Sequence, residues 1–184
     1  MISGNGRDNA EKKPRRLLIP GVFRAPAVLF AFIAILAAAL VLLSPADRLI
    51  AQCGGRRLFA WPIKTGDCFE VTFTHSLNLS PITDVIEWTG SDFVVRKSFF
   101  KSFGAGVPVP SDGIGSALVF VDGRYELLGI DKHMSYFTIM TQDVPNHRIS
   151  LSGREASLLE LAGSGRAVDI FVKRAPFAAG LTAK

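Results

Sequence analysis

The sequence predicts an all-β domain, an antiparallel sandwich or small barrel of about nine short strands with one short helix, preceded by a single transmembrane helix. Two observations predict this architecture. The nineteen residues from Ala25 to Leu43 carry no charge, and from Leu49 onward short runs of alternating apolar and polar residues are separated by turn signals. We therefore expect a basic tail (1–24), a transmembrane helix (25–43), a linker (44–48), a β domain (49–174) and a flexible tail (175–184).

The uncharged run fits a membrane anchor. As a helix it would span about 28 Å, close to the roughly 30 Å hydrocarbon thickness of a bilayer. Six basic and two acidic residues precede it. Because Lys and Arg favour the cytoplasmic side, we expect a cytoplasmic N-terminus and an exported β domain. A cleaved signal peptide, with Ser44-Pro45-Ala46 as the cleavage site, and lipidation of Cys53 after the unsuitable Gln52 are the alternatives.

The charge distribution argues against nucleic acid as a partner. The formal net charge is +5, but the six basic and two acidic residues of the first 24 positions supply +4 of it. The predicted β domain is therefore nearly neutral. The basic excess indicates membrane topology rather than a phosphate-binding surface.

The first strands follow from two turns. Gly54-Gly55 is typical of a two-residue hairpin, and residues 64–67 form the next turn signal, which leaves Arg57–Ile63 as a strand. Cys53 and Cys68 then lie at opposite ends of that strand, on the order of 20 Å apart at about 3.3 Å per residue. A disulfide needs Cα atoms within about 7 Å, so we expect free thiols although an oxidising compartment would allow a bridge.

The remaining elements continue the pattern of strand and turn. Asp122-Gly123 is the strongest hairpin signal in the chain. Only Arg154–Ala162 has the leucine spacing of a helix, with Gly163 as its stop. The further strands expected are Phe69–Thr74, Ile82–Trp88, Phe93–Phe103, Leu118–Val121, Arg124–Leu128, Ser135–Thr141, His147–Ser152 and Ala167–Val172.

His75 and Asp84 are polar residues in phase with apolar positions of neighbouring strands. Burying either without a partner would cost on the order of 1–3 kcal/mol, so we expect a hydrogen bond between them. Such a pair is either a structural clasp or a ligand-binding or proton-sensing site. Ser76 is a poor nucleophile for His75, because adjacent residues of a strand point to opposite faces.

The segment Ser102–Pro108 is the second dense motif. Its glycines, Gly104 and Gly106, do not open a phosphate-binding helix, because Pro108 and Pro110 follow almost at once. They indicate instead a shaped loop, either a structural turn or a recognition surface with Phe103 as its apolar anchor. Ser102 begins this loop.

The sequence carries no motif for a metal, a cofactor or a catalytic centre. His133 and His147 stand beside turns, without partners at metal-ligand spacing, and there is no His-Glu-x-x-His, paired Cys-x-x-Cys or nucleophile elbow. We therefore expect a protein that is not an enzyme.

Two linked motifs resemble a known bacterial family. His75-Ser76-Leu77, then Ser80-Pro81 and Asp84, resembles the His-Ser-Val-x-x-Thr-Pro-x-x-Glu signature of domain of unknown function 1850, and residues 102–108 are similar to that family's Ser-Phe-Gly-Ala-Gly-Leu-Pro. The resemblance covers about residues 49–173. Leu77, Ser80 and the shorter Asp84 are mild departures.

The resemblance implies a location and a partner. Members are small exported or membrane-anchored proteins whose genes tend to lie beside those of TAXI-type tripartite (TRAP) transporters. It implies a non-enzymatic accessory subunit, anchored in the inner membrane with a periplasmic β domain, that contacts the permease or the solute receptor. A stand-alone periplasmic ligand-binding or sensory module and an exported hydrolase are the alternatives. The candidate binding residues are His75, Ser76, Asp84, Ser102, Phe103, Gly104, Gly106 and Pro108.

Overall fold

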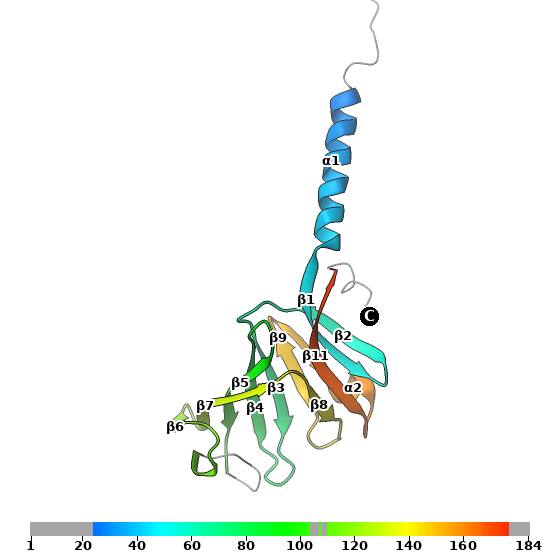
Figure 1. The fold of residues 1–184 in the computed structure, drawn as a ribbon. Helices are drawn as coiled ribbons and strands as arrows, with labels where there is room; N and C mark the ends of the chain where they lie inside the picture. Colours follow the sequence, from blue (N-terminus) through cyan, green and yellow to red (C-terminus); the bar gives the residue numbers. More distant parts are fainter. Residues whose placement is uncertain (1–23, 104–106, 108–109, 177–184) are drawn as a thin grey trace, which may run out of the picture. The chain divides into compact units, whose positions relative to one another are not determined.

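Antiparallel pairing organises residues 45–176 into two sheets in the computed structural model, which describes residues 24–103, 107 and 110–176 (Figure 1). The described residues form eleven strands, so the all-β prediction is confirmed. The strands are β1 (Pro45–Cys53), β2 (Arg56–Pro62), β3 (Cys68–Thr74), β4 (Pro81–Trp88), β5 (Phe93–Phe100), β6 (Ala117–Val121), β7 (Arg124–Met134), β8 (Phe137–Met140), β9 (Arg148–Leu151), β10 (Arg154–Ser157) and β11 (Ala167–Pro176).

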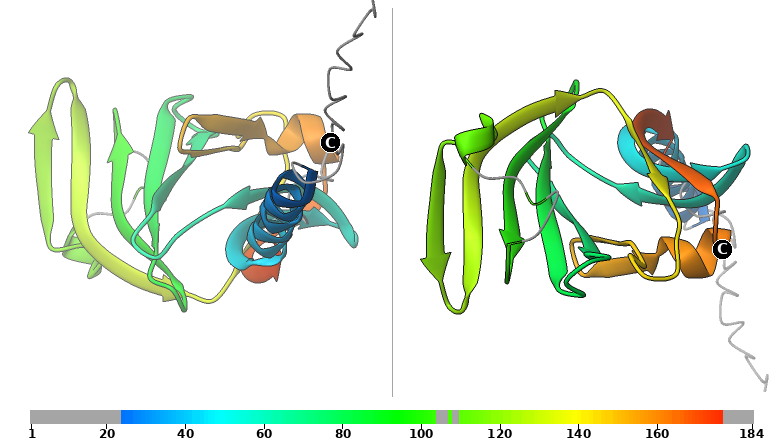
Figure 2. Two further views of the ribbon diagram at one scale, coloured as in Figure 1. Left: turned by 90° about the horizontal axis from the view of Figure 1, so that it is seen from above. Right: turned by 90° about the horizontal axis from the view of Figure 1, so that it is seen from below.

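The two sheets pack face to face and share one core. One has the order β2-β1-β11-β8 and the other the order β10-β9-β3-β4-β5-β7-β6. Figure 2 shows the smaller sheet against the larger one. Leu49 and Ile170 of the smaller sheet and Phe69 and Phe93 of the larger one are all 0% exposed and belong to the same apolar cluster. This burial is the main driving force for the sandwich-like arrangement.

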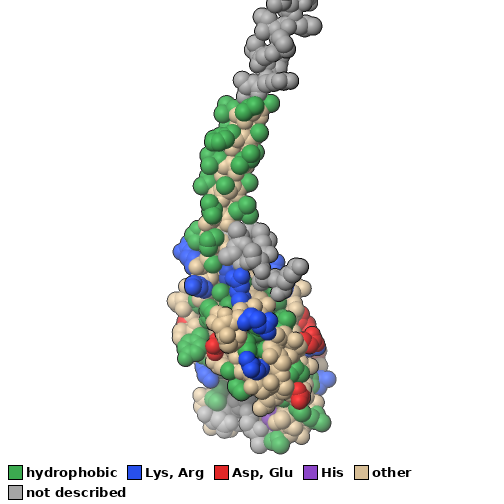
Figure 3. All heavy atoms as spheres, turned by 90° about the vertical axis from the view of Figure 1, so that its right-hand side faces the viewer, with side chains coloured by type: hydrophobic (Ala, Val, Ile, Leu, Met, Phe, Trp, Pro, Cys, Tyr) green, Lys and Arg blue, Asp and Glu red, His purple; other side chains and the backbone are tan. Residues whose placement is uncertain are grey.

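Helix α1 (Arg24–Leu43) belongs mostly to a separate unit, because the chain divides between Leu40 and Val41. The side chains described within it are those of residues 27–40, 42 and 43. They are almost all apolar and exposed, with Phe30 72% and Ile35 69% accessible, and hydrophobic side chains cover the helix in Figure 3. Among the described residues, no helix is both long and apolar enough to cross a membrane.

Several predicted boundaries are wrong at the ends of elements. The expected linker 44–48 is mostly strand, because β1 begins at Pro45 and pairs with the end of β11 from the first residue. That pairing also places Ala175 and Pro176 in β11 rather than in a flexible tail, whose other residues, 177–184, lie outside the described part of the chain.

The predicted helix Arg154–Ala162 is half strand. Ser152 and Gly153 both adopt positive φ, which turns the chain back so that β10 pairs with β9. Only α2 (Leu158–Ala162) is helical, and Ser157 caps it by accepting a hydrogen bond from the Glu160 N–H at 3.3 Å. The expected strand Phe93–Phe103 ends early as well, at Phe100.

The cysteines are free thiols, as predicted. Cys53 is buried at the end of β1, and Cys68 is exposed at the start of β3. Burial and, to a smaller extent, the nearby Glu87 carboxylate raise the pKa of the Cys68 thiol above its ordinary value.

Candidate functional site

A cavity of about 320 Å³ lies against the larger sheet. Strands β3, β4, β5, β7 and β8 all contribute to its wall. Most of the lining side chains are aliphatic or aromatic, among them Val71, Phe73, Ile86, Val95, Phe137 and Ile139. A concave apolar site with a few polar groups is the usual form of a small-molecule site in a protein.

Asp84 and Ser98 form the polar pair of this cavity. They lie directly opposite each other across β4 and β5, and Ser98 is only 2% exposed. The pKa of Asp84 is raised, because burial disfavours the carboxylate, while the hydrogen bond with Ser98 and the positive charge of Lys132 partly oppose that shift. Asp84 is therefore an ionisable group held at an apolar wall.

A β-bulge brings the polar groups onto one face. The register between β4 and β5 shifts so that Ile86 pairs with Val95 and Val85 with Lys97, leaving Arg96 as the extra residue. Val95 and Ser98 would face opposite sides in a regular strand, since they are three residues apart. Because the bulge inserts one extra residue, the side chains of Val95 and Ser98 face the same side of the sheet, and both line the cavity.

His147 and Lys132 complete the polar lining. The His147 ring stacks on Phe73 with 5.1 Å between centroids, and burial lowers the pKa of the imidazole, which favours its neutral form. Its Nδ1 atom is buried and has no hydrogen-bond partner among the described residues. Lys132 lies opposite Val95 on β7.

The predicted hydrogen bond between His75 and Asp84 is wrong. Asp84 pairs with Val71 in the sheet. His75 comes four residues after Val71, so it lies about 13 Å farther along the chain at 3.3 Å per residue. The His75 Nδ1 atom instead accepts a hydrogen bond from the Leu77 N–H at 3.3 Å. Ser76 is exposed in the same turn.

The loop after β3 contacts the start of the second motif. The Asn78 amide donates to the Ser102 carbonyl oxygen at 3.4 Å, and the Ser102 hydroxyl donates to the Ser80 hydroxyl at 3.4 Å. Phe103 is 46% exposed and packs against Phe100 and Tyr125. Gly104, Gly106 and Pro108 lie outside the described residues. The two motifs therefore meet at one surface, apart from Asp84.

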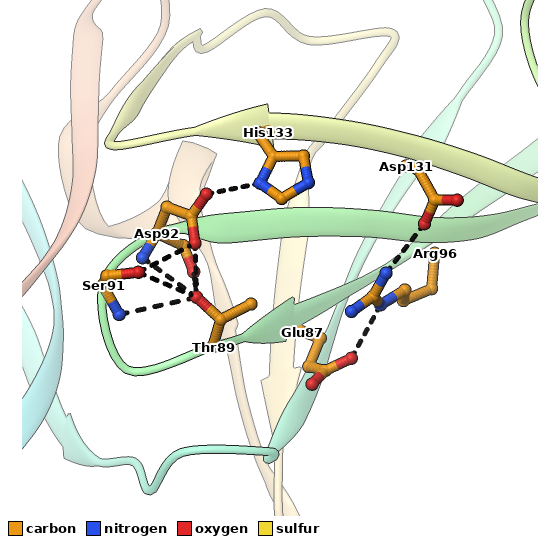
Figure 4. A network of polar contacts seen from close by, with 7 residues as sticks. All are labelled: Glu87, Thr89, Ser91, Asp92, Arg96, Asp131 and His133. Atoms are coloured by element: carbon orange, nitrogen blue, oxygen red, sulfur yellow. Dashed lines mark hydrogen bonds and ion pairs between the residues drawn. The ribbon is translucent and has the colours of Figure 1, made fainter.

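A separate polar network ties the hairpin between β4 and β5 to β7 (Figure 4). The Asp92 carboxylate bonds to the Thr89 hydroxyl and pairs with His133 Nδ1 at 2.5 Å. The Thr89 hydrogen bond, followed by that of His133, lowers the pKa of Asp92. Asp92 also accepts from the Ser91 hydroxyl at 3.2 Å, so the carboxylate rather than the imidazole contacts the hydroxyls. That order of contacts does not place the imidazole to activate a hydroxyl, and the network joins the hairpin to β7.

The sequence pattern points to Asp84 but not to its neighbours in the cavity. Ser98 and Lys132 carry no motif, and Lys132 lies beyond the predicted end of its strand, Leu128. His147 belongs to the stretch Asn146–Ile149, which resembles the closing block of the family, but nothing in that resemblance places it at the cavity. Ser98 is a small polar residue in a strand that is largely apolar, and this pattern could have indicated a buried polar position. Its pairing with Asp84 depends on the bulge, which the sequence pattern does not show. No group of three or more His, Cys, Asp or Glu residues suited to a metal ion occurs in the part of the chain that the structure describes.

Comparison with known proteins gives one match. A family model described as "Domain of unknown function (DUF1850)" matches residues 69–158, from β3 through β10. All four polar residues of the cavity lie within the matched segment. No curated protein and no solved structure matches the chain.

Proposed function

The chain belongs to the family described as domain of unknown function DUF1850, and we propose that its β domain binds a small amphipathic molecule in the cavity beside Asp84. The observation that carries this proposal is the placement of a partly buried carboxyl group, and of a buried imidazole nitrogen that has no hydrogen-bond partner among the described residues, at a mostly apolar wall. The volume is at the small end of the roughly 300–1,000 Å³ typical of ligand pockets, which favours a compact ligand.

We propose that α1 anchors this domain in a membrane, with the basic tail in the cytoplasm and the β domain in the periplasm. The support is the uncharged run Ala25–Leu43 and the exposure of its apolar side chains. Exposed apolar area costs about 25 cal/mol per Å² in water, so a helix with apolar residues on every side favours a lipid environment. The basic residues before the run set the direction of insertion.

An accessory, non-enzymatic role beside a TAXI-type TRAP transporter is our second proposal, and it rests on the family resemblance. A surface at the meeting point of the two motifs supports it. Leu77, Leu79 and Phe103 are 71%, 68% and 46% exposed there, and Asn78 and Ser102 join the loops that carry them. Exposed apolar residues gathered on paired loops are typical of a docking surface.

The ligand-binding proposal is tested by thermal unfolding of the full chain in detergent with a library of small molecules. A ligand present at 100 times its Kd stabilises by about 2.7 kcal/mol, which raises the midpoint by on the order of 5–10 °C for a domain of this size. Ile130→Phe places a larger side chain in the cavity wall and should reduce that shift. If no compound raises the midpoint of the parent chain more than that of Ile130→Phe, the proposal fails.

The accessory role predicts a change in association without a change in folding. Phe103→Ala should reduce recovery of the permease with this chain from native membranes by about tenfold or more, because an aromatic anchor contributes about 2 kcal/mol or more to a docking site. Phe120→Ala, a change of the same type at a 62% exposed residue of β6, is the matched control. Equal recovery in both variants, or recovery of the parent chain in the soluble fraction, would contradict the proposal.

A further inference from the structure

Strand β6 is an open edge of the larger sheet, as Figure 1 and Figure 2 show. β7 occupies one side of it, and no strand of the described residues pairs with the other side. We infer that this free side is the contact of a symmetric dimer, in which β6 pairs antiparallel with β6 of a second copy of the chain, centred on Val119. The inference does not depend on the ligand proposed for the cavity.

The other sheet edges carry features that discourage pairing, and β6 does not. β2 begins with Arg56 and Arg57 and ends with Pro62, β10 carries Arg154 and Glu155, and β8 has only four residues. Charges, proline and short length are the usual protections of an edge strand. β6 is a run of five apolar residues with no charge and no proline. An edge without these protections favours pairing with another strand.

The side chains of β6 are apolar and exposed on both faces of the sheet. Val119, Phe120 and Val121 are 38%, 62% and 47% exposed, and because they are consecutive they point to alternate faces. Phe120 extends a row of aromatic rings, since its ring lies 4.9 Å from that of Tyr125, which stacks on Phe100 at 5.7 Å. A strand added at this edge would cover apolar surface on both faces, in addition to pairing the main chain.

The hairpin geometry determines which main-chain groups of β6 are free. The residues that flank a two-residue turn form a hydrogen-bonded pair, and such pairs alternate along an antiparallel ladder. Val121 and Val119 therefore bond to β7, while Leu118 and Phe120 direct their N–H and C=O groups away from it. Within the described residues, no other hydrogen bond reaches the main chain of Leu118 or Phe120. These groups are available to a further strand.

A second copy fits these groups when Val119 faces Val119 of the copy. Leu118 of each chain then lies opposite Phe120 of the other, and each such pair exchanges both of its main-chain hydrogen bonds. The paired segment contains no charged residue, so no like charges face each other. The strand supplies both halves of the contact, as two-fold symmetry requires, and this self-complementarity favours a second copy over an unlike partner.

Cysteine cross-linking of the full chain in detergent tests the register. The two Val119 Cα atoms lie about 4.5 Å apart in this register, a separation that a disulfide spans. Val121 lies opposite Ala117, which separates the two Val121 Cα atoms by about 13 Å along the strand. With the exposed native thiol removed by Cys68→Ser, mild oxidation should give at least tenfold more linked dimer for Val119→Cys than for Val121→Cys. Random collision would favour the opposite order, because Val121 is the more exposed residue.

Sedimentation of the full chain, in a buffer that matches the density of the detergent, tests whether this contact holds the dimer. The parent chain should sediment as a dimer. Val119→Lys places two like charges directly opposite each other and should raise the dissociation constant of the dimer at least tenfold. Val121→Lys is the matched control, because its ammonium faces Ala117, and it should change the constant less than threefold. Circular dichroism should show the same β content in all three chains, since both positions lie at a sheet edge.

A monomeric parent chain overturns the inference. A dimer that is unaffected by Val119→Lys also overturns it, because its contact then lies elsewhere, and so does equal cross-linking at the two positions. If Val119→Lys lowers the β content, the cross-linking result decides alone. Because Phe120 lies in the proposed contact, comparisons that use Phe120→Ala are made in the Val119→Lys chain, which is expected to be monomeric.

Discussion

Phe93→Ala is expected to lower the free energy of unfolding of the β domain by about 3–5 kcal/mol, the usual cost of removing a large buried aromatic side chain. Phe93 is fully buried and contacts Phe69, Trp88 and Phe137 with ring centroids 5.3–5.6 Å apart. Phe137 belongs to the other sheet, so this ring joins the two layers. Its loss leaves a void between layers that cannot close without moving a strand.

The measurement is urea unfolding of the full chain in detergent, followed by the fluorescence of Trp61 and Trp88. Phe120→Ala serves as the matched control, because it deletes the same atoms from a side chain that is 62% exposed, and it should cost less than about 1 kcal/mol. Equal losses in the two variants would show that Phe93 does not join the sheets as described. A domain with 5–15 kcal/mol of stability can lose a large part of it through this single change.

The strands could be predicted where local pattern and turn chemistry agreed. Phe69, Val71 and Phe73 alternate with polar residues, and Asp122-Gly123 does adopt positive φ between β6 and β7. The helix prediction over 154–162 failed because the leucine spacing near Leu158 was extended backward across a tight turn at Ser152 and Gly153. Helical spacing in a segment of two turns is a weak signal beside a turn that pairs strands.

The candidate site could be predicted only in part. The alternating pattern of β4 predicts Asp84 on an apolar face, and Asp84 lies beside apolar residues in the lining of the cavity. The predicted partner of Asp84 is wrong. The prediction places His75 opposite Asp84, whereas Asp84 pairs with Val71, four residues before His75. The bulge at Arg96 determines which side chains of β5 share the face of Asp84. Register and bulges depend on tertiary pairing, which a periodicity of two cannot fix. His147 reaches the cavity from a distant segment.

Replacing Asp84 by Asn is expected to make the ligand-free domain more stable at neutral pH, because the variant does not hold a charge in a dehydrated place. The pKa of Asp84 is raised in the folded state above its ordinary value of 3.8, mainly by burial. The folded chain therefore binds more protons than the unfolded chain in the interval above 3.8, so the free energy of unfolding of the parent falls as pH rises through that interval. Asn cannot ionise, keeps an oxygen that accepts from Ser98, and has nearly the same shape. The stability gained by Asp84→Asn should therefore grow from about pH 4 upward and level off above the folded pKa.

The difference between parent and variant isolates this contribution, because His147 and the other titrating groups are common to both chains. Asp92→Asn is the control of opposite sign. The pKa of Asp92 is lowered in the folded state, so the stability that its carboxylate contributes is fully present above about pH 3.8 and is lost as pH falls through the folded pKa. The variant should therefore be less stable than the parent by a constant amount at neutral pH, and that difference should shrink as pH falls toward 3. Urea unfolding at several pH values between 3 and 8 measures both. A difference for Asp84→Asn that stays constant with pH, or that falls as pH rises, would show that the carboxyl group is not held in a dehydrated site. A carboxyl group that costs stability at the cavity wall is what the proposed ligand-binding role predicts, since strain at a binding site is offset only when the ligand is bound.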